Sequence, residues 1–176
     1  MNVSRIHIIG SVGSGKTTLA KQLSQLLHIP YYELDNVSWI RRKEGDLMRS
    51  PEKRDECLQS IIQSPSWIVE GVHYTWTRDS FHHAELILLL DTPYRTRIFR
   101  IIKRFLRQKT GFEHAHYKPT FRIFLRMFKW NHHFEKVAKP IIQEMYHPYE
   151  DKVIILKNKE DLTKIKARLF PTQQTG

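Results

Sequence analysis

The residues best suited to chemistry lie in one short stretch near the start of the chain, IIGSVGSGKTTLA, residues 8–20. Gly10, Gly13, Gly15, Lys16 and Thr17 fit the pattern G-x-x-x-x-G-K-[ST]. In this pattern the glycines let backbone N–H groups turn toward phosphate oxygens, the lysine reaches the β- and γ-phosphates, and the hydroxyl ligates Mg²⁺. The stretch therefore predicts a nucleotide phosphate site with Mg²⁺.

The surroundings of this loop strengthen the prediction. A β-branched run precedes it, and a helix with leucines on one face follows it. The alternative is a glycine-rich turn that only caps a helix, but such a turn does not require Lys-Thr at these positions. The other residues predicted to hold the nucleotide are Ser11, Ser14, Thr18 and Asn158.

The elements that must position this loop alternate between apolar runs and helical patterns, which indicates a parallel sheet covered on both faces. The predicted strands are Arg5 to Ile9, Tyr31 to Leu34, Trp67 to Glu70, Glu85 to Leu90 and Lys152 to Leu156. The predicted helices begin near Lys16, Pro51, Pro93 and Phe121, with a further one to about Tyr146 and a closing one from Asp161 to Leu169. Thr92 is predicted to cap the helix at Pro93, and Asp91 is a second candidate cap.

Length and composition set the frame for these elements. With 176 residues and 40% apolar content, the chain is expected to form one domain, residues 1–176. Its single cysteine, Cys57, cannot form an internal disulfide, and no apolar run approaches the length of a membrane span. We therefore expect a cytoplasmic protein without a membrane span; the sequence carries no signal for an oligomeric state.

The positive charge is concentrated in one segment. The net charge of the chain is +11, and residues 95–136 contain twelve Lys and Arg against two acidic residues. Such a local surplus predicts a site for a polyanion, whether nucleotide, nucleic acid or anionic membrane. Arg100 and Arg104 are four residues apart and share one helix face, which we place opposite the Ile98, Ile102 and Phe105 stripe.

Two other patterns suggest different functions. Asn158, Lys159 and Asp161 match the N-K-x-D of GTPases, but no D-x-x-G occurs and few residues follow Asp161. We interpret this segment as a polar loop leading into the last helix. The histidine pairs 82–83, 114 and 116, and 132–133 are interpreted as solvated or phosphate-facing, because adjacent helix positions face different ways.

The order of five motifs resembles a known family. The phosphate loop is followed by YYELDNVSW, WIVEGVHY, LILLLDTP and an Arg-rich helix, and this order is similar to the adenylate-kinase-related P-loop kinases described as DNA topology modulation proteins. The resemblance spans nearly the whole chain. It implies a nucleoside-monophosphate-kinase type of α/β fold, with a five-stranded parallel sheet in order 2-3-1-4-5. It also implies a substrate-binding region at about 36–66 and a basic lid at about 95–136.

The resemblance also assigns individual residues. It places Asp35 where related kinases hold substrate or Mg²⁺, and Glu70 where nucleotide kinases have the Asp of a D-G pair. Both acids also end apolar runs, at the sheet edge where open α/β folds bind ligands. A carboxylate there can hold a Mg²⁺ water or accept a proton from an acceptor hydroxyl. EGVHYTWTR has no Pro-Arg, which argues against an ordinary nucleoside monophosphate as acceptor.

Two function hypotheses follow. The first is a Mg²⁺-dependent phosphotransferase that moves the γ-phosphoryl group of ATP to a small-molecule or nucleotide acceptor. Lys16, Asp35, Arg100 and Arg104 would be catalytic, and Thr17 and Glu70 would hold the metal. The second is a nucleotide-dependent regulator whose basic segment grips nucleic acid; no zinc-finger or helix-turn-helix signature supports it. Weaker alternatives are a GTPase, and a membrane-surface helix at Arg95 to Lys109.

Overall fold

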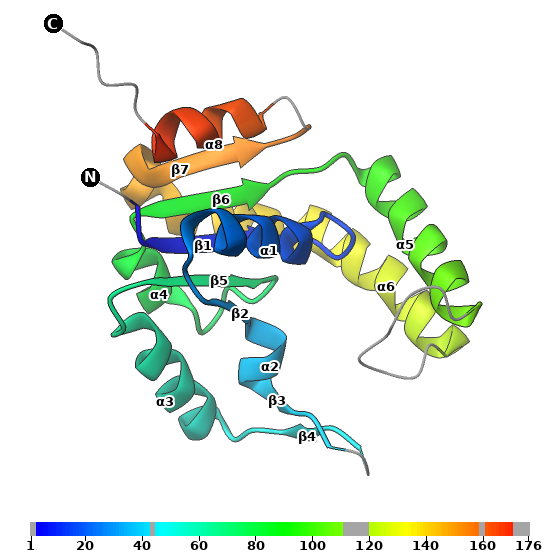
Figure 1. Ribbon diagram of the computed structural model, residues 1–176. Helices are drawn as coiled ribbons and strands as arrows, with labels where there is room; N and C mark the ends of the chain where they lie inside the picture. Colours follow the sequence, from blue (N-terminus) through cyan, green and yellow to red (C-terminus); the bar gives the residue numbers. More distant parts are fainter. Residues whose placement is uncertain (1–2, 43–44, 111–119, 159–160, 171–176) are drawn as a thin grey trace, which may run out of the picture.

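The computed structural model describes residues 3–42, 45–110, 120–158 and 161–170. A five-stranded parallel sheet in the order β2-β5-β1-β6-β7 forms the middle layer (Figure 1). Its strands are β1 (Arg5–Gly10), β2 (Tyr31–Glu33), β5 (Trp67–Gly71), β6 (Leu86–Leu90) and β7 (Val153–Leu156). Counted among themselves in chain order, these strands have the order 2-3-1-4-5. The predicted sheet order is therefore confirmed, and each strand differs from its prediction by one residue at one end.

The sheet separates two hydrophobic cores, because successive strand residues point to opposite faces. Ile6 and Ile8 of β1 pack on one face against α1 (Lys16–Leu27) and α8 (Leu162–Leu169). Ile9 points to the other face, which is covered by α3 (Pro51–Ile62), α4 (Arg78–His83) and α7 (Lys139–Tyr146). Both faces of the sheet are thus covered by helices, as the apolar runs of the sequence predicted.

Several short elements were not predicted from the sequence. They are α2 (Leu34–Ser38), the antiparallel hairpin of β3 (Trp39–Ile40) and β4 (Leu47–Met48), the helix α4, and a 3₁₀ turn at His147–Lys152. Each is at most six residues long, too short to show a hydrophobic period. The hairpin and α3 form the segment for which we expected substrate binding.

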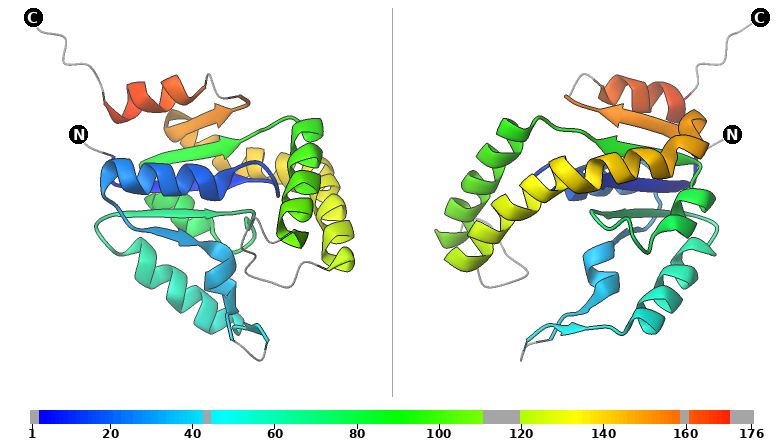
Figure 2. Two further views of the ribbon diagram at one scale, coloured as in Figure 1. Left: turned by 45° about the vertical axis from the view of Figure 1, so that its right-hand side comes forward. Right: turned by 180° about the vertical axis from the view of Figure 1, so that it is seen from behind.

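Two longer helices extend away from the sheet. These are α5 (Tyr94–Lys109) and α6 (Phe121–His133), which lie side by side in both views of Figure 2. The rings of Phe105 and Phe124 stack between them with centroids 4.3 Å apart. Together they form the predicted basic lid region, except for residues 111–119, which lie outside the described part of the chain.

A single continuous helix runs from the lid region to the sheet. α6 continues through a π-helical turn, Phe134–Ala138, directly into α7, and the right-hand view of Figure 2 shows this helix along its length. Pro140 lies in the first turn of α7 and has no N–H to donate to the residue four positions before it. The π-helical turn therefore lies just before Pro140, the residue that interrupts the helical hydrogen-bond ladder.

The apolar stripe of α5 faces inward only in part: Phe105 packs on Phe124 of α6, but Ile102 does not face inward. Arg97 and Ile101 are fully buried, whereas Ile102 is 39% exposed and lies on the outer side. Arg97 forms an ion pair with Glu135 in the π-helical turn, so its charge has a partner inside the fold. The helix thus packs through Arg97 and Ile101, because a distant carboxylate compensates the buried charge of Arg97.

The predicted caps of α5 were also wrong. The Thr92 hydroxyl does not cap this helix; it donates to the Ser14 carbonyl at 3.1 Å. The Asp91 carboxylate pairs with the Lys139 ammonium of α7 at 2.6 Å. The end of β6 is therefore tied to the glycine-rich loop on one side and to α7 on the other.

The buried ion pair gives a test of this packing. We expect Glu135→Gln to lower the free energy of unfolding by about 3 kcal/mol, because it leaves the buried Arg97 guanidinium without an anion. The double variant Glu135→Gln with Arg97→Met should recover most of this loss, since it removes the charge as well. Urea denaturation measures both, with exposed Lys136→Gln as the control. A Glu135→Gln protein within about 0.5 kcal/mol of the wild type would contradict the role of this pair.

Candidate phosphate-binding and phosphoryl-transfer site

The glycine-rich loop connects β1 to α1 at the carboxyl edge of the sheet. Gly13 and Gly15 have φ of 75° and 102°, in the left-handed region that side chains disfavour. A Cβ at Gly13 would also lie 3.0 Å from the Arg97 carbonyl oxygen. Gly15 occupies the N-cap of α1 and has no side chain to close the helix terminus. The first amides of α1 thus face outward, as an anion site requires.

Lys16 is the first residue of α1 and is held against this loop. Its Nζ donates to the Ser11 carbonyl at 3.0 Å. Burial lowers the pKa of Lys16, and the nearby carboxylates of Glu70 and Asp35 partly oppose this shift. The structure therefore brings the predicted lysine and both predicted acids into one electrostatic cluster.

Thr17 and Glu70 form the oxygen-rich part of the site. The Thr17 hydroxyl donates to Glu70 Oε1 at 2.5 Å, although the two residues are on α1 and β5. A hydroxyl and a carboxylate are oxygen ligands of the kind that Mg²⁺ takes, usually with few protein ligands and several waters or phosphate oxygens. In the described part of the chain no group of three or more His, Cys, Asp or Glu could hold a metal. The pair thus fits Mg²⁺ held jointly with phosphate.

Glu70 lies in a buried position, which makes its ionisation costly. Burial raises the pKa of Glu70 above its ordinary value of 4.5, against the opposing effects of Lys16 and the Thr17 hydrogen bond. The adjacent strand carries Glu33 in register with Glu70, and its charge raises the pKa further. A divalent cation beside Glu70 would offset this concentration of negative charge.

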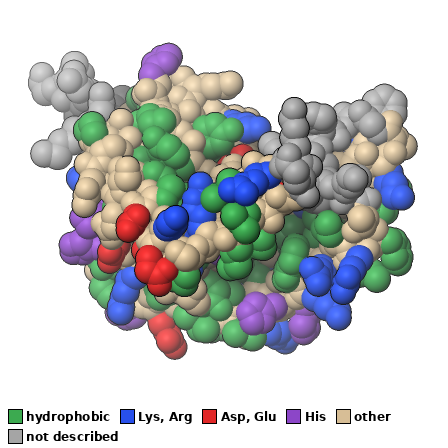
Figure 3. Space-filling view, turned by 90° about the horizontal axis from the view of Figure 1, so that it is seen from below, with side chains coloured by type: hydrophobic (Ala, Val, Ile, Leu, Met, Phe, Trp, Pro, Cys, Tyr) green, Lys and Arg blue, Asp and Glu red, His purple; other side chains and the backbone are tan. Residues whose placement is uncertain are grey.

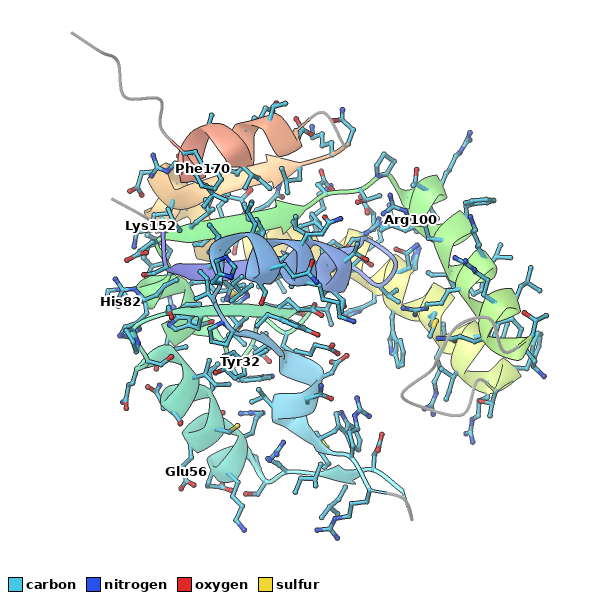
Figure 4. All side chains as sticks on the ribbon, viewed as in Figure 1. Tyr32, Glu56, His82, Arg100, Lys152 and Phe170 are labelled. Atoms are coloured by element: carbon cyan, nitrogen blue, oxygen red, sulfur yellow. The ribbon has the colours of Figure 1, made fainter. Side chains whose placement is uncertain are left out.

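The raised pKa of Glu70 predicts a pH dependence of stability. Above pH 4.5 the unfolded chain loses this proton while the folded chain still binds it, so the free energy of unfolding falls as pH rises. The slope is about 1.4 kcal/mol per pH unit between the ordinary pKa and the raised one. Glu70→Gln should remove this slope without metal present, whereas Glu56→Gln, an exposed change on α3 (Figure 4), should retain it. Equal slopes in wild type and Glu70→Gln would contradict the assignment.

Asp35 lies in the first turn of α2, just beyond β2. His73 Nε2 is 2.9 Å from Asp35 Oδ1, and this hydrogen bond lowers the pKa of Asp35. The Asp35 side chain is 63% exposed, so its carboxylate is accessible from solvent. His73 was not predicted, because the only signal for it is a polar residue two positions after β5.

Arg100 reaches the loop as predicted, and Arg104 makes a different contact. Arg100 Nη1 donates to the carbonyls of Ser14 at 2.8 Å and Gly13 at 3.3 Å, and Figure 4 shows it on the side of α5 near this loop. Arg104 Nη2 is 3.2 Å from Met127 Sδ on α6. The positive charge of Arg104 still lowers the pKa of Lys16. Arg100 therefore contacts the loop directly, whereas Arg104 acts on Lys16 through its charge.

Asn131 is a further residue that sequence reasoning missed. It lies fully buried on α6, and its Oδ1 accepts a hydrogen bond from the Ser11 hydroxyl at 3.0 Å. Ser11 is thus tied to the lid helices rather than free in the loop. Ser14 is buried in the loop and Gly10 is the last residue of β1, whereas Thr18 is exposed on α1. A lone asparagine in an apolar and basic helix was the only signal for this contact.

The aspartate of the N-K-x-D pattern has a structural role in its own loop. The Asp161 carboxylate accepts from the backbone N–H of Lys157 and Asn158, and Asn158 Oδ1 accepts from the Asp161 N–H. Asn158 and Asp161 thus lie before α8, as predicted, and a nucleotide role for Asn158 stays a prediction. His82 lies at the opposite end of the sheet from Arg100 in Figure 4, while residues 111–119, including His114 and His116, are outside the described chain.

The sheet order, the glycine-rich loop and the lid helices define a P-loop fold of the nucleoside-monophosphate-kinase type. Solved structures with this fold include shikimate kinase from Acinetobacter baumannii in complex with shikimate, with a TM-score of 0.61 and 17% identity over 98% of this chain and 96% of that one. Shikimate kinase from Aquifex aeolicus has a TM-score of 0.51 and 16% identity over 98% and 99% of the chains.

Sequence comparison finds relatives that are 24–28% identical. The uncharacterized protein YqaC of Bacillus subtilis is 28% identical over 101 residues, 56% of this chain and 55% of that protein. Shikimate kinases of Tolumonas auensis and Flavobacterium johnsoniae are 27% and 24% identical over 54% and 77% of this chain, and 62% and 90% of their own. No model of a protein family matches.

These similarities support the class of the protein but not a specific family. The chain spans little more than half the length of the first two relatives. They confirm the predicted similarity at the level of P-loop kinases. The finer resemblance to DNA topology modulation proteins stays a prediction.

Proposed function

We propose that the protein is an ATP- and Mg²⁺-dependent phosphotransferase that acts on a small hydroxylated acceptor. The observation that carries this proposal is the convergence of Lys16, Arg100 and the Thr17–Glu70 pair on one glycine-rich loop. A nucleotide-binding module without transfer chemistry would not require a separate accessible carboxylate beside the lysine. Asp35 supplies such a carboxylate, and its charge acts on Lys16.

Each residue has a role in moving the γ-phosphoryl group from ATP to the acceptor oxygen, which releases ADP. The loop amides and Lys16 bind phosphate oxygens, and Arg100 balances charge on the transferring group. Asp35 orients the acceptor hydroxyl and takes its proton, and His73 fixes the orientation of the Asp35 carboxylate. Thr17 and Glu70 would hold Mg²⁺, which would supply positive charge to offset the negative charge of the phosphates.

The acceptor is proposed from the similarity to shikimate kinases. Shikimate is the first candidate, because relatives by sequence and by fold are shikimate kinases. The segment at 36–66 would surround it, since α2 carries Asp35 and the hairpin follows directly. Two of its guanidiniums are already engaged: Arg41 pairs with Asp46, and Arg49 donates to the Val37 carbonyl at 3.0 Å. We propose that the whole chain works as one unit.

An ATP-consumption assay with candidate acceptors tests the proposal. Shikimate, nucleosides, nucleoside monophosphates and small hydroxylated metabolites are offered separately with Mg²⁺, and the phosphorylated product is identified by mass spectrometry. Asp35→Asn should abolish product formation with the true acceptor while retaining ATP binding. Product formation by Asp35→Asn at the wild-type rate would refute the role of Asp35. ATP hydrolysis that no acceptor stimulates would instead favour a regulatory ATPase.

Adenine is expected to be preferred over guanine. The N-K-x-D carboxylate that would read guanine is engaged with the backbone of its own loop. Competition between ATP and GTP measures this preference. GTP binding about tenfold tighter than ATP, a difference of about 1.4 kcal/mol, would revive the GTPase hypothesis.

A further inference from the structure

The outer face of α5 carries large apolar side chains that no described element covers. Phe99, Ile102 and Leu106 are 64%, 39% and 58% exposed. They recur at three and four residues and therefore form one stripe, about 10 Å long at 1.5 Å per residue. The buried Arg97 and Ile101 are on the opposite side of the helix. The stripe thus points away from the phosphate-binding loop.

Basic side chains border this apolar stripe. Arg95 and Lys103 flank it on α5, and both are exposed. Neither forms an ion pair with a carboxylate in residues 3–42, 45–110, 120–158 and 161–170. Figure 3 shows blue and green side chains next to one another on the right-hand side, where α5 and α6 lie.

The apolar stripe and its flanking cations together restrict which kind of partner can bind this face of α5. A second copy of the chain would bring two strongly positive surfaces together, which like-charge repulsion opposes. A nucleic-acid backbone would satisfy the cations but would leave Ile102 and Leu106 against phosphate and water. An anionic bilayer satisfies both features, since acyl chains cover the apolar stripe while lipid phosphates meet the flanking Lys and Arg.

We propose that the outer face of α5 docks the protein on an anionic lipid surface. None of the described helices has the length and apolar character needed to cross a membrane, so the attachment is peripheral. Because the stripe and the arginines that act on the loop occupy different faces of α5, docking leaves the phosphate site uncovered. The attachment needs no nucleotide and does not depend on the proposed transfer reaction.

Vesicle flotation tests the proposal with the full chain and no nucleotide. Vesicles of phosphatidylcholine with phosphatidylserine are compared with vesicles of phosphatidylcholine alone, at low and high salt. We expect binding only to the former, weakened by salt. Phe99→Ser with Leu106→Ser should lower the partition coefficient about tenfold or more. Arg95→Gln with Lys103→Gln should lower it about fivefold for each charge removed.

Matched variants distinguish docking through α5 from nonspecific adsorption of the protein to vesicles. Leu26 on α1 and Phe170 are comparably exposed, at 52% and 53%, so Leu26→Ser with Phe170→Ser should bind vesicles as the wild type does. Lys21→Gln with Lys53→Gln is the charge control, since both lysines are exposed elsewhere. Circular dichroism and thermal midpoints verify that every variant is folded.

Three outcomes would overturn the proposal. The first is equal flotation with neutral and anionic vesicles, or full binding by the Phe99→Ser with Leu106→Ser protein. The second is tight binding to mixed-sequence duplex DNA or RNA with no vesicle binding, which would assign the cations to nucleic acid. The third is a dimer in sedimentation equilibrium that the apolar double variant dissociates, which would make the stripe a self-association surface.

Discussion

Lys16→Ala should lower phosphoryl transfer by about 10³-fold or more while the protein stays folded. Lys16 donates to the Ser11 carbonyl from the first position of α1, where its ammonium lies beside the loop amides. Its removal deletes a cation proposed to bind the β- and γ-phosphates during transfer. Turnover with the identified acceptor and the affinity for ATP are measured together.

The comparison for this prediction lies on the same helix. Lys21 is exposed on α1, so Lys21→Ala removes an equal charge from the same element without touching the loop. Its turnover should equal that of the wild type. Retention of the wild-type rate by Lys16→Ala would show that the loop is not a phosphate site. Thermal midpoints of both variants verify the fold, since the apolar residues of α1 are unchanged.

Arg100→Ala should lower kcat on the order of 10²-fold and weaken ATP binding by less than about fivefold. Arg100 approaches the loop from α5 and already donates to two of its carbonyls. A charge in this position contributes more as the phosphoryl group transfers than when ATP only binds. Arg104→Ala should have a smaller effect in the same direction, because Arg104 contacts Met127 and not the loop.

The control for Arg100 is Lys103→Ala, which removes an exposed cation one turn further along α5. Full turnover by Arg100→Ala would contradict a role in transfer. A uniform loss of nucleic-acid affinity in Arg100→Ala and Arg104→Ala, with a salt slope reduced by about one, would instead assign both arginines to a phosphate backbone.

The fold and the loop could be predicted because their signals are local. The five apolar runs, the glycines and the Lys-Thr pair each define structure within a few residues. The inward face of α5 could not, because periodicity assumes that the apolar stripe is the buried one. In α5 the buried position belongs to Arg97, and its partner Glu135 is 38 residues away in the chain.

The same limit applies to the site. Asp35 and Glu70 were predicted from the family resemblance and from their places at strand ends, but His73 and Asn131 are bound to partners distant in sequence. Thr92 was predicted as a cap from its place before Pro93, yet its hydroxyl bonds to the loop 78 residues earlier. Local rules identify residues able to do chemistry, whereas long-range contacts decide which of them meet.

The continuous helix of residues 121–146 connects the proposed lid region directly to the helix layer that covers the sheet. It is about 39 Å long at 1.5 Å per residue, and its far end, α7, is packed beneath the sheet. A rotation of the lid region about the sheet must therefore either shift α7 or bend this helix. The π-helical turn at Phe134–Ala138 is the place where the helix can bend, because its backbone hydrogen bonds already span a wider turn there. Since Asn131 lies just before this turn and accepts a hydrogen bond from Ser11, we expect a bend at this turn to move the phosphate loop as well.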